Sequence, residues 1–550
     1  MTGKIPMAET HEVFNQPTPL ENYNAFNSDR VLQNYVEKFG GAWGQDQLAA
    51  YGDKVGHELL RAGFDANGHK PEFQSHDRFG RRIDQVNYHP AYHQLMQSAI
   101  EAGHHSLPWT HSVPGAHVVR AGIEYMHSQA DPGSGCPLTM TFASVPALQH
   151  QPDIAKQWLP KILVNTYDPR NVPFFEKQGL TIGMAMTEKQ GGSDVRANTS
   201  RARPIGQAGP GQAYEIVGHK WFCSAPMCDA FLVLAQTDGG LSCFLLPRWR
   251  PDGSKNAMYV QRIKNKMGNV SNASSEVEYR GAFAWMIGEE GRGVRTILEM
   301  VAMTRFDCMV GSSAIMGLAT AQAIHHTGGR SVFGKNLHEQ PLMQNVLADL
   351  AIESEAALAI SMRLAHALDN PQDEAEQLLI RIGTAVGKYW ICKRAAQHTY
   401  ESMECIGGVA VVEDNVLARL YRESPINAIW EGSGNVQCLD VARAIQREPR
   451  VVDAFIQELE KAKGHYEEFD TSLHDLKQVF SQPGVEESQL RRVVENMALL
   501  WQGVTLIQYS TAEVAGAFIQ SRLRDGGHMY GTLGQGADLG AIIQRARPGL

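Results

Sequence analysis

Hydrophobic residues in the first third of the chain recur at helical spacing. Within residues 90–102, Tyr92, Leu95, Met96 and Ile100 each lie three or four positions from a neighbour of the same kind. This spacing places them on one face of a helix. Loops rich in Gly, Asp, Asn and Pro separate such runs, so the pattern predicts a helical N-terminal domain.

The pattern changes near residue 183, where short runs of β-forming residues replace the helical spacing. Three of them cover residues 214–217, 230–235 and 242–246. Each is bounded by Gly, Pro, Asp or Asn, which end strands and form turns. Short strands at this spacing predict a small β-barrel or sandwich.

Helical spacing returns after residue 288, over 293–324, 342–368 and 377–403. Long amphipathic runs joined by short loops are typical of a helix bundle. The pattern breaks at Pro449, and further helical sequence follows to the end of the chain.

Helices, then strands, then helices again favour an α+β, mostly helical fold over an alternating α/β sheet. A length of 550 residues is also too great for one hydrophobic core and suggests three or four domains. We therefore expect a domain at each of residues 1–182, 183–288, 289–446 and 447–550.

Composition narrows the class of protein. No stretch of 18 apolar residues occurs, so we expect no membrane span. Residues 1–20 are polar and do not resemble a secretory signal, and the 8 cysteines form no CxxC pair. Both features favour a cytoplasmic protein with reduced thiols and no metal site. The net charge of −9 argues against a globally basic nucleic-acid binder.

The familiar motifs for dinucleotides, phosphates, serine nucleophiles and zinc do not occur in the chain. A glycine-rich segment, Met-Thr-Glu-Lys-Gln-Gly-Gly-Ser-Asp, does lie at the junction of the first two regions, over residues 186–194. Its glycines let a ligand approach the backbone, and its hydroxyls can bond to that ligand. Alone, the segment could equally be an ordinary turn.

Five further segments follow it in a fixed order, and together the six resemble the acyl-CoA dehydrogenase family. They cover residues 186–194, 218–224, 288–293, 330–334, 407–408 and 430–435. The chain is closer still to the AidB-like, alkylation-response branch of that family, because 14–17, 136–142 and 303–307 match as well.

The resemblance implies a helical domain, a middle β-barrel, a four-helix bundle and an extra C-terminal helical domain. It implies a homotetramer that binds FAD, with Arg330 and Phe333 reaching the FAD of a neighbouring subunit. The cofactor-binding residues implied are Met186, Thr187, Gly192, Ser193, Phe222, Ser224, Ala225, Pro226, Arg330, Phe333, Gly407, Gly408, Ile429, Trp430, Gly432, Ser433 and Asn435.

Glu431 matches the catalytic base of the family. Removal of a weakly acidic thioester α-proton needs a positioned base, and burial beside Trp430 would raise the pKa of this carboxyl. Some relatives carry their base on a bundle helix, at a position that is Thr304 here. Without the resemblance, Glu431 could simply pair with a helix end, and Arg305 could anchor a carboxylate or form a structural ion pair.

The AidB-like branch also implies binding of double-stranded DNA by the C-terminal domain. Residues 445–550 hold 11 Lys and Arg against 14 Asp and Glu, so this domain is not basic overall. Several arginines nevertheless cluster, and salt-dependent phosphate contacts would need such a patch. The candidates are Arg443, Arg491, Arg492, Arg522 and Arg524.

Two functions therefore stay open. One is a metabolic flavin dehydrogenase acting on a short or branched acyl-CoA. The other is a flavoprotein of the alkylation response that binds DNA, protects it or detoxifies alkylating agents, and has weak dehydrogenase activity. A structural module without a cofactor is a third alternative.

Overall fold

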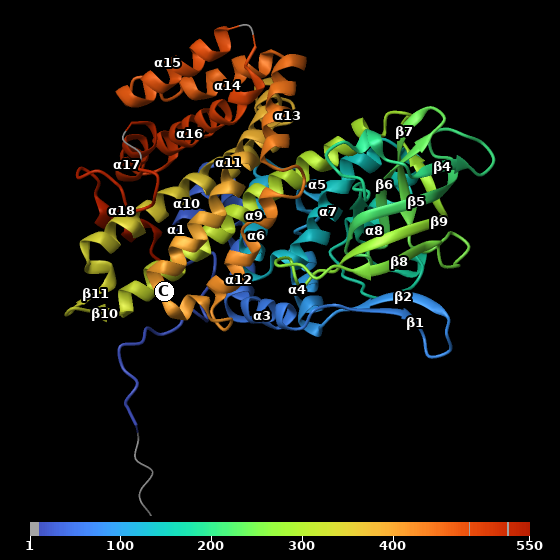
Figure 1. The fold of residues 1–550 in the computed structure, drawn as a ribbon, viewed down its shortest axis with the longest axis horizontal. Helices are drawn as coiled ribbons and strands as arrows, with labels where there is room; N and C mark the ends of the chain where they lie inside the picture. The colour runs from blue at the N-terminus through green and yellow to red at the C-terminus, as the bar shows by residue number, and fades with distance from the viewer. Residues whose placement is uncertain (1–9, 483, 525–526) are drawn as a thin grey trace, which may run out of the picture.

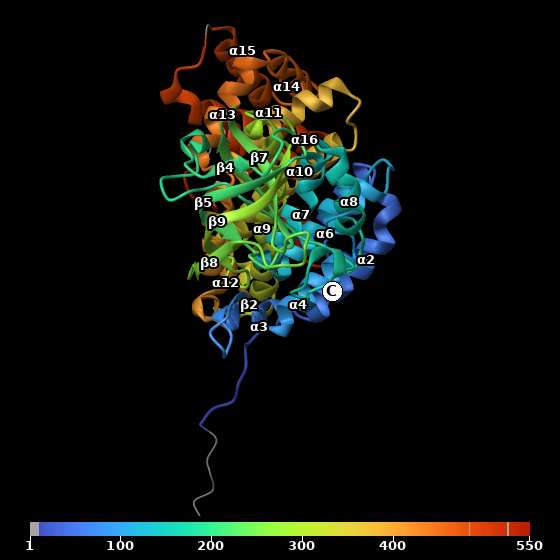
Figure 2. The same ribbon diagram turned by 90° about the vertical axis from the view of Figure 1, so that its right-hand side faces the viewer.

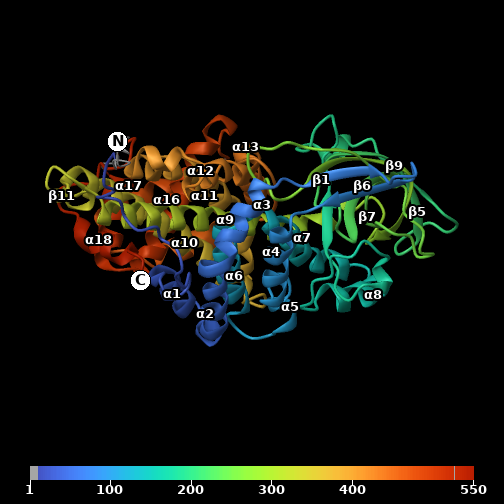
Figure 3. The same ribbon diagram turned by 90° about the horizontal axis from the view of Figure 1, so that it is seen from below.

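The computed structural model describes residues 10–482, 484–524 and 527–550. A β-barrel lies at one end of the molecule, long helices form its centre, and the C-terminal helices lie above them in Figure 1. Seen from below, the N-terminal helices lie along one side of the central helices, and the barrel stands at one end (Figure 3).

The N-terminal part is helical, as its hydrophobic spacing predicts. Helix α6 is buried along its whole length and packs against α7 and the central helix α9 (Gly293–Gly329). The helices are α1 (Arg30–Lys38), α2 (Gln45–Lys54), α3 (Leu60–Gly68), α4 (Pro90–Glu101), α5 (Leu107–Thr110), α6 (Ala116–Ala130), α7 (Pro132–Gln149) and α8 (Pro152–Ile162).

A hairpin interrupts these helices, and the sequence pattern did not predict it. Strands β1 (Glu72–His76) and β2 (Arg82–Asn87) pair antiparallel. The Asp77 carboxylate accepts hydrogen bonds from the backbone N–H of Phe79 at 2.8 Å and of Arg81 at 2.9 Å, which closes the turn. Only one face of β2 is buried, and short polar strands of this kind leave little hydrophobic signal.

The middle region forms the expected small barrel. Strand β6 pairs with β4 and β7, and β5 and β9 join β4 to β7, so the ring closes. Strand β3 pairs parallel to β6, and β8 pairs with β9. The strands are β3 (Ile182–Ala185), β4 (Arg201–Pro204), β5 (Ala213–Ser224), β6 (Ala230–Thr237), β7 (Gly240–Pro247), β8 (Met258–Ile263) and β9 (Ser274–Ile287).

Three long helices form the centre: α9 (Gly293–Gly329), α10 (Pro341–Leu368) and α11 (Glu374–Ile406). Helix α9 begins against the barrel, because a Cβ at Gly293 would lie 2.4 Å from the backbone of Ser242 in β7. It ends at a small hairpin, β10 (Ser331–Val332) and β11 (Lys335–Asn336). Two shorter helices, α12 (Val416–Glu423) and α13 (Gly434–Arg447), pack against α11.

The C-terminal helices pack on the central bundle through α14, α16 and α18, and Trp501 of α16 is fully buried. A Cβ at Gly383 of α11 would lie 2.9 Å from the Trp501 ring, so a glycine is needed there. In the side view of Figure 2, α14 and α15 lie at the top. The helices are α14 (Arg450–Glu460), α15 (Glu467–Ser481), α16 (Leu490–Tyr509), α17 (Ala512–Leu523) and α18 (Leu539–Ala546). In the described part of the chain, no helix is both long and apolar enough to span a membrane.

Candidate active site

Glu431 lies in the short segment that precedes α13, against the N-terminal half of α9. The Thr304 hydroxyl of α9 donates to Glu431 Oε2 at 2.9 Å. Glu431 has a φ of +56°, in the left-handed region that non-glycine residues rarely adopt. Such a conformation costs about 1–3 kcal/mol and persists only where surrounding contacts hold it.

Those contacts are present on the backbone around Glu431. Arg305 Nε donates to the Glu431 carbonyl at 2.9 Å, and Gln437 Nε2 donates to the same oxygen at 3.1 Å. The buried Lys388 ammonium donates to the carbonyls of Trp430 and Gly432, each at 2.9 Å. The carboxylate of Glu431 is therefore carried on a rigid support from α9, α11 and α13.

Burial raises the pKa of Glu431, as the sequence predicted. The Thr304 hydrogen bond and the charges of Lys388 and Arg305 act in the opposite direction and lower it. The carboxyl consequently sits in an environment that favours its protonated form more than water does, which suits a general base that has to accept a proton.

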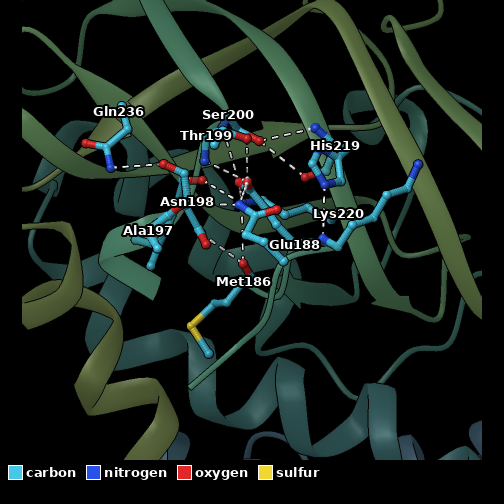
Figure 4. A network of polar contacts seen from close by, with 12 residues as sticks. Met186, Glu188, Ala197, Asn198, Thr199, Ser200, His219, Lys220 and Gln236 are labelled. Atoms are coloured by element: carbon cyan, nitrogen blue, oxygen red, sulfur yellow. Dashed lines mark hydrogen bonds and ion pairs between the residues drawn. The ribbon is translucent and has the colours of Figure 1, made fainter. Parts of the chain in front are cut away.

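The glycine-rich segment at 186–194 is held by a buried ion pair (Figure 4). Glu188 Oε1 accepts from the Lys220 ammonium of β5 at 2.8 Å, and both side chains are fully buried. Burial alone would raise the pKa of Glu188, but Lys220 and the Thr199 and Ser200 contacts lower it to about 2. Glu188 is therefore a charged internal support of the segment.

Above that support, Thr187 is half-buried and held from two sides. Its carbonyl accepts from the Trp221 N–H at 2.8 Å. A Cβ at Gly192 would lie 2.4 Å from the Thr187 hydroxyl, so only glycine allows the loop to approach it. Met186 is also half-buried, and Ser193 is exposed. The segment can offer backbone and hydroxyl groups to a ligand on this side.

The end of β5 supplies the next group of predicted residues. Phe222 is 46% exposed, and Ser224 Oγ lies 3.1 Å from Ser274 Oγ of β9. Ala225 and Pro226 form a buried turn after the strand, so their side chains point into protein. An exposed aromatic ring beside a hydroxyl suits a flat, polar-edged ligand such as flavin.

Beside Glu431, the remaining predicted residues are unevenly exposed. Ile429 is 67% exposed, whereas Trp430 is half-buried and donates from Nε1 to Asn427 Oδ1 at 2.9 Å. Gly432 has a φ of +99°, and Ser433 is exposed. The exposed Asn435 accepts from Arg491 Nε of α16 at 2.8 Å, which links this segment to the C-terminal domain.

Four predicted cofactor residues lie at the opposite end of the bundle. Arg330 and Phe333 follow the end of α9, which places them roughly 40 Å along the helix from Thr304. Phe333 is 99% exposed with a φ of +50°, and Arg330 donates to the Asn15 carbonyl at 2.9 Å. Gly407 and Gly408 follow α11, and open space lies where a Cβ would stand on either.

One of the five arginines predicted to contact DNA is placed elsewhere. Arg522 is largely buried and pairs with Asp349 and with Glu353, the latter at 2.9 Å. Its guanidinium serves an internal ion-pair network, so the prediction that it binds DNA is wrong. Arg524 pairs with Glu468 at 3.0 Å. Arg443, Arg491 and Arg492 are exposed on α13 and α16.

Several residues of the site escaped the sequence-based prediction. Lys388 and Gln437 hold the Glu431 backbone, and Lys266 lies beside Ser274. A lysine inside a long amphipathic helix looks like a surface residue, and no local signal marks it as buried. Arg305 was predicted either to anchor a carboxylate or to form a structural ion pair. It does pair with Asp440, at 2.9 Å.

Three family models match the chain in order. Residues 15–169 match the N-terminal domain of the adaptive response protein AidB. Residues 183–282 match the middle domain of acyl-CoA dehydrogenases, and residues 291–446 match their C-terminal domain. Together the three cover the regions that hold the barrel, the bundle and Glu431.

Individual relatives and solved structures of the same family are also similar to the chain. The chain is 44% identical over 518 residues, 94% of its length and 95% of the relative's, to the putative acyl-CoA dehydrogenase AidB of Escherichia coli. Caenorhabditis elegans ACDH-11, solved in complex with a CoA ligand, superimposes with a TM-score of 0.85 at 25% identity over 96% of each chain. An acyl-CoA dehydrogenase complexed with FAD from Bacillus anthracis shares the fold, with a TM-score of 0.66 at 17% identity over 92% of this chain and 88% of that one.

These matches confirm the fold predicted from the sequence. The matched regions include the barrel and bundle motifs on which the resemblance was based. The chain therefore belongs to the acyl-CoA dehydrogenase family, in its AidB-like branch, and is an FAD-dependent oxidoreductase.

Proposed function

We propose that the protein oxidises an acyl thioester at its Cα–Cβ bond, with Glu431 as the base that removes the α-proton. The observation that carries this proposal is the rigid, strained placement of a carboxyl whose pKa burial raises. Strain and a shifted pKa at one residue are typical of functional sites.

The residues on the barrel side fit a flavin. The half-buried Thr187 and Ser224 offer hydroxyls, and Phe222 offers an exposed ring. FAD bound there would supply the hydride acceptor for the β-hydrogen. Glu431 itself accepts the α-proton on its carboxylate, while Arg305 and Lys388 keep its backbone fixed during that transfer.

We also propose that each complete site is shared between two subunits of a homotetramer. Arg330, Phe333, Gly407 and Gly408 lie too far along the bundle to contact a flavin beside Glu431 of the same chain. An exposed phenylalanine on a strained turn is unfavourable in water and is explained by a partner that covers it. Phe14 and Leu342, both more than three-quarters exposed, add to this apolar surface.

Isotopic substitution tests the chemistry directly. Replacing the α-hydrogens of a short acyl-CoA with deuterium should slow reduction of the bound flavin, because Glu431 breaks that C–H bond. A matched substrate with deuterium only at a terminal methyl group that lies beyond the β-carbon should react at the ordinary rate. Equal rates for all three substrates in single-turnover reactions would contradict α-proton removal in the slow step.

A second function, in the alkylation response, is favoured by one surface. Arg381 and Arg443 are about half-exposed and share the carboxylate of Asp440 with Arg305, which leaves this side of α13 positively charged. Arg491 and Arg492 continue the cationic side chains onto α16. We propose that this surface binds double-stranded DNA without sequence preference, so that the protein protects DNA or detoxifies alkylating agents nearby.

Salt dependence tests the DNA proposal. Changing Arg443, Arg491 and Arg492 together to Gln should lower the slope of log affinity against log salt by about 3, since each phosphate contact contributes about 0.9. Changing the exposed Arg78 and Arg81 of the β1–β2 hairpin to Gln is the control and should leave the slope unchanged. A slope unaffected by the triple change in mobility-shift titrations would remove this surface from the proposal.

A further inference from the structure

A lysine and two serines form a chain of hydrogen bonds at the barrel side of the site. Lys266 lies in the loop between β8 and β9, and its ammonium donates to Ser274 Oγ at 2.8 Å and to the Asn272 carbonyl at 2.7 Å. Ser274 begins β9 and stands opposite Ser224 at the end of β5. The two hydroxyl oxygens are 3.1 Å apart.

The donor and acceptor properties of these groups give the chain of hydrogen bonds a direction. A charged lysine only donates, whereas a hydroxyl has one proton and can both donate and accept. Either serine could donate in their shared hydrogen bond. The positive charge on Lys266 favours the arrangement in which Ser274 turns its oxygen toward the ammonium and its proton toward Ser224. The Ser224 oxygen is then occupied as an acceptor, so its proton points away from Ser274. When Lys266 loses its proton, its nitrogen can accept a hydrogen bond from Ser274. Both hydroxyls can then rotate, so that Ser224 donates to Ser274.

We propose that Lys266 is a positioning residue which, through Ser274, determines whether the Ser224 hydroxyl donates to or accepts from the flavin. The proposal rests on the placement of Ser224 beside the flavin in the proposed function. It goes beyond that function because Lys266 is not among the residues proposed to contact the flavin. The proposal links the charge of this lysine to the hydrogen bonding of the cofactor.

The loop that carries Lys266 is held firmly by contacts with other elements. The hydrogen bonds from Lys266 through Ser274 to Ser224 therefore belong to a well-fixed part of the structure. Both carboxylate oxygens of Glu423 in α12 accept the Asn269 N–H at 2.8 Å. Ser271 donates to the Asp131 carboxylate at 2.7 Å. A Cβ at Gly268 would lie 2.5 Å from the Arg422 carbonyl, which shows how closely the loop packs on α12.

Lys266 can change charge at mildly alkaline pH. Burial lowers its pKa to about 8, and the facing groups Cys136 of α7, Glu423 of α12 and Asp131 act in the opposite direction. Cys136 in turn faces Ser224 and Glu431, and burial raises the pKa of its thiol to about 11. Lys266 is thus charged below pH 8 and loses its charge as the pH rises through that value.

The visible absorption of bound flavin, measured on the FAD-loaded full-length protein, tests the proposal without any substrate. The wild-type band should shift between pH values below and above 8, because the Ser224 hydrogen bond reverses. Lys266→Met and Ser274→Ala should each lose that shift. Lys255→Met is the matched control and should keep it, since burial lowers the pKa of Lys255 to about 8 as well, but on a part of the barrel facing Asp84 and Arg248.

The variants separate the possible failures. Suppose that the flavin band of Lys266→Met and Ser274→Ala shifts with pH as in the wild type, while Ser224→Ala alters the band. Then Lys266 does not act on Ser224 through Ser274, and the placement of Ser224 beside the flavin stands. If the flavin band of Ser224→Ala matches that of the wild type at every pH, both the placement of Ser224 beside the flavin and the proposed role of Lys266 are wrong. Should Lys266→Met not retain FAD, Ser274→Ala decides, because it removes a single hydroxyl.

Discussion

The Thr304 hydroxyl donates to the Glu431 carboxylate at 2.9 Å and joins the longest helix of the protein to the strained segment before α13. Thr304 stands where, by resemblance, some relatives carry their base. Its hydroxyl cannot replace a carboxylate as a base, but it stabilises the ionised form of the carboxyl that lies opposite. This position on α9 thus supports the proposed base Glu431 here, whereas in some relatives it carries the base itself.

Replacing Thr304 with Val should move the acid limb of the profile of kcat/KM against pH to higher pH. The hydrogen bond lowers the pKa of Glu431, so its loss raises that pKa, and the base must be ionised to act. A hydrogen bond to a charged group is worth about 1.5–3 kcal/mol, which corresponds to a displacement of about one unit or more. Thr384→Val, which loses only a bond within α11, is the control. An unmoved acid limb in Thr304→Val would show that the titrating group is not Glu431.

The sequence predicted the elements with a strong period and missed features that depend on distant partners. Helix α10 was expected over 342–368 and spans Pro341–Leu368, because its apolar residues recur without a break. Arg522 resembled a surface arginine. It is largely buried because it pairs with Asp349, 173 positions earlier, and no local pattern reveals such a partner. The same limit applies to Lys266 and Lys388, whose acceptors are mainly backbone carbonyls.

The Glu188–Lys220 pair should be essential to the stability of the barrel. Lys220→Met leaves a buried carboxylate without its partner, which typically costs about 3–5 kcal/mol in the free energy of unfolding. The double variant Lys220→Met, Glu188→Leu removes both charges and should recover most of that loss. Denaturant unfolding followed by tryptophan fluorescence measures both variants. A wild-type midpoint in Lys220→Met would show that the pair does not support the segment.

Acid should weaken the same contact. The pKa of Glu188 is lowered to about 2 in the folded protein, so its stabilising contribution is complete above the unfolded value near 4.5 and is lost as the pH falls toward 2. The difference in unfolding free energy between the wild type and the double variant should therefore shrink over that interval. A difference that stays constant from neutral to acidic pH would contradict the assignment.

Hybrid oligomers test the shared site. Phe333→Asp should weaken FAD binding and subunit association, and Glu431→Gln should bind FAD but reduce it only very slowly. Each variant alone should have little activity. Co-expressed, they form some sites that take an intact Glu431 from one subunit and an intact Phe333 from the other, so activity should return to at most about half that of the wild type. If purified hybrids stay inactive, the two residues belong to the same site.

The most direct measurement is anaerobic reduction of the bound flavin by a panel of acyl-CoA thioesters, followed at its visible absorption band. The wild type should be bleached by at least one member of the panel. Glu431→Gln, loaded with the same amount of FAD, should react about 100- to 10,000-fold more slowly, as expected when a general base is removed. As a control, Glu448→Gln changes a half-buried carboxylate that pairs with Arg450 away from the site, and it should react as the wild type does. Bleaching of Glu431→Gln at the wild-type rate would contradict the central claim that this carboxylate removes the α-proton.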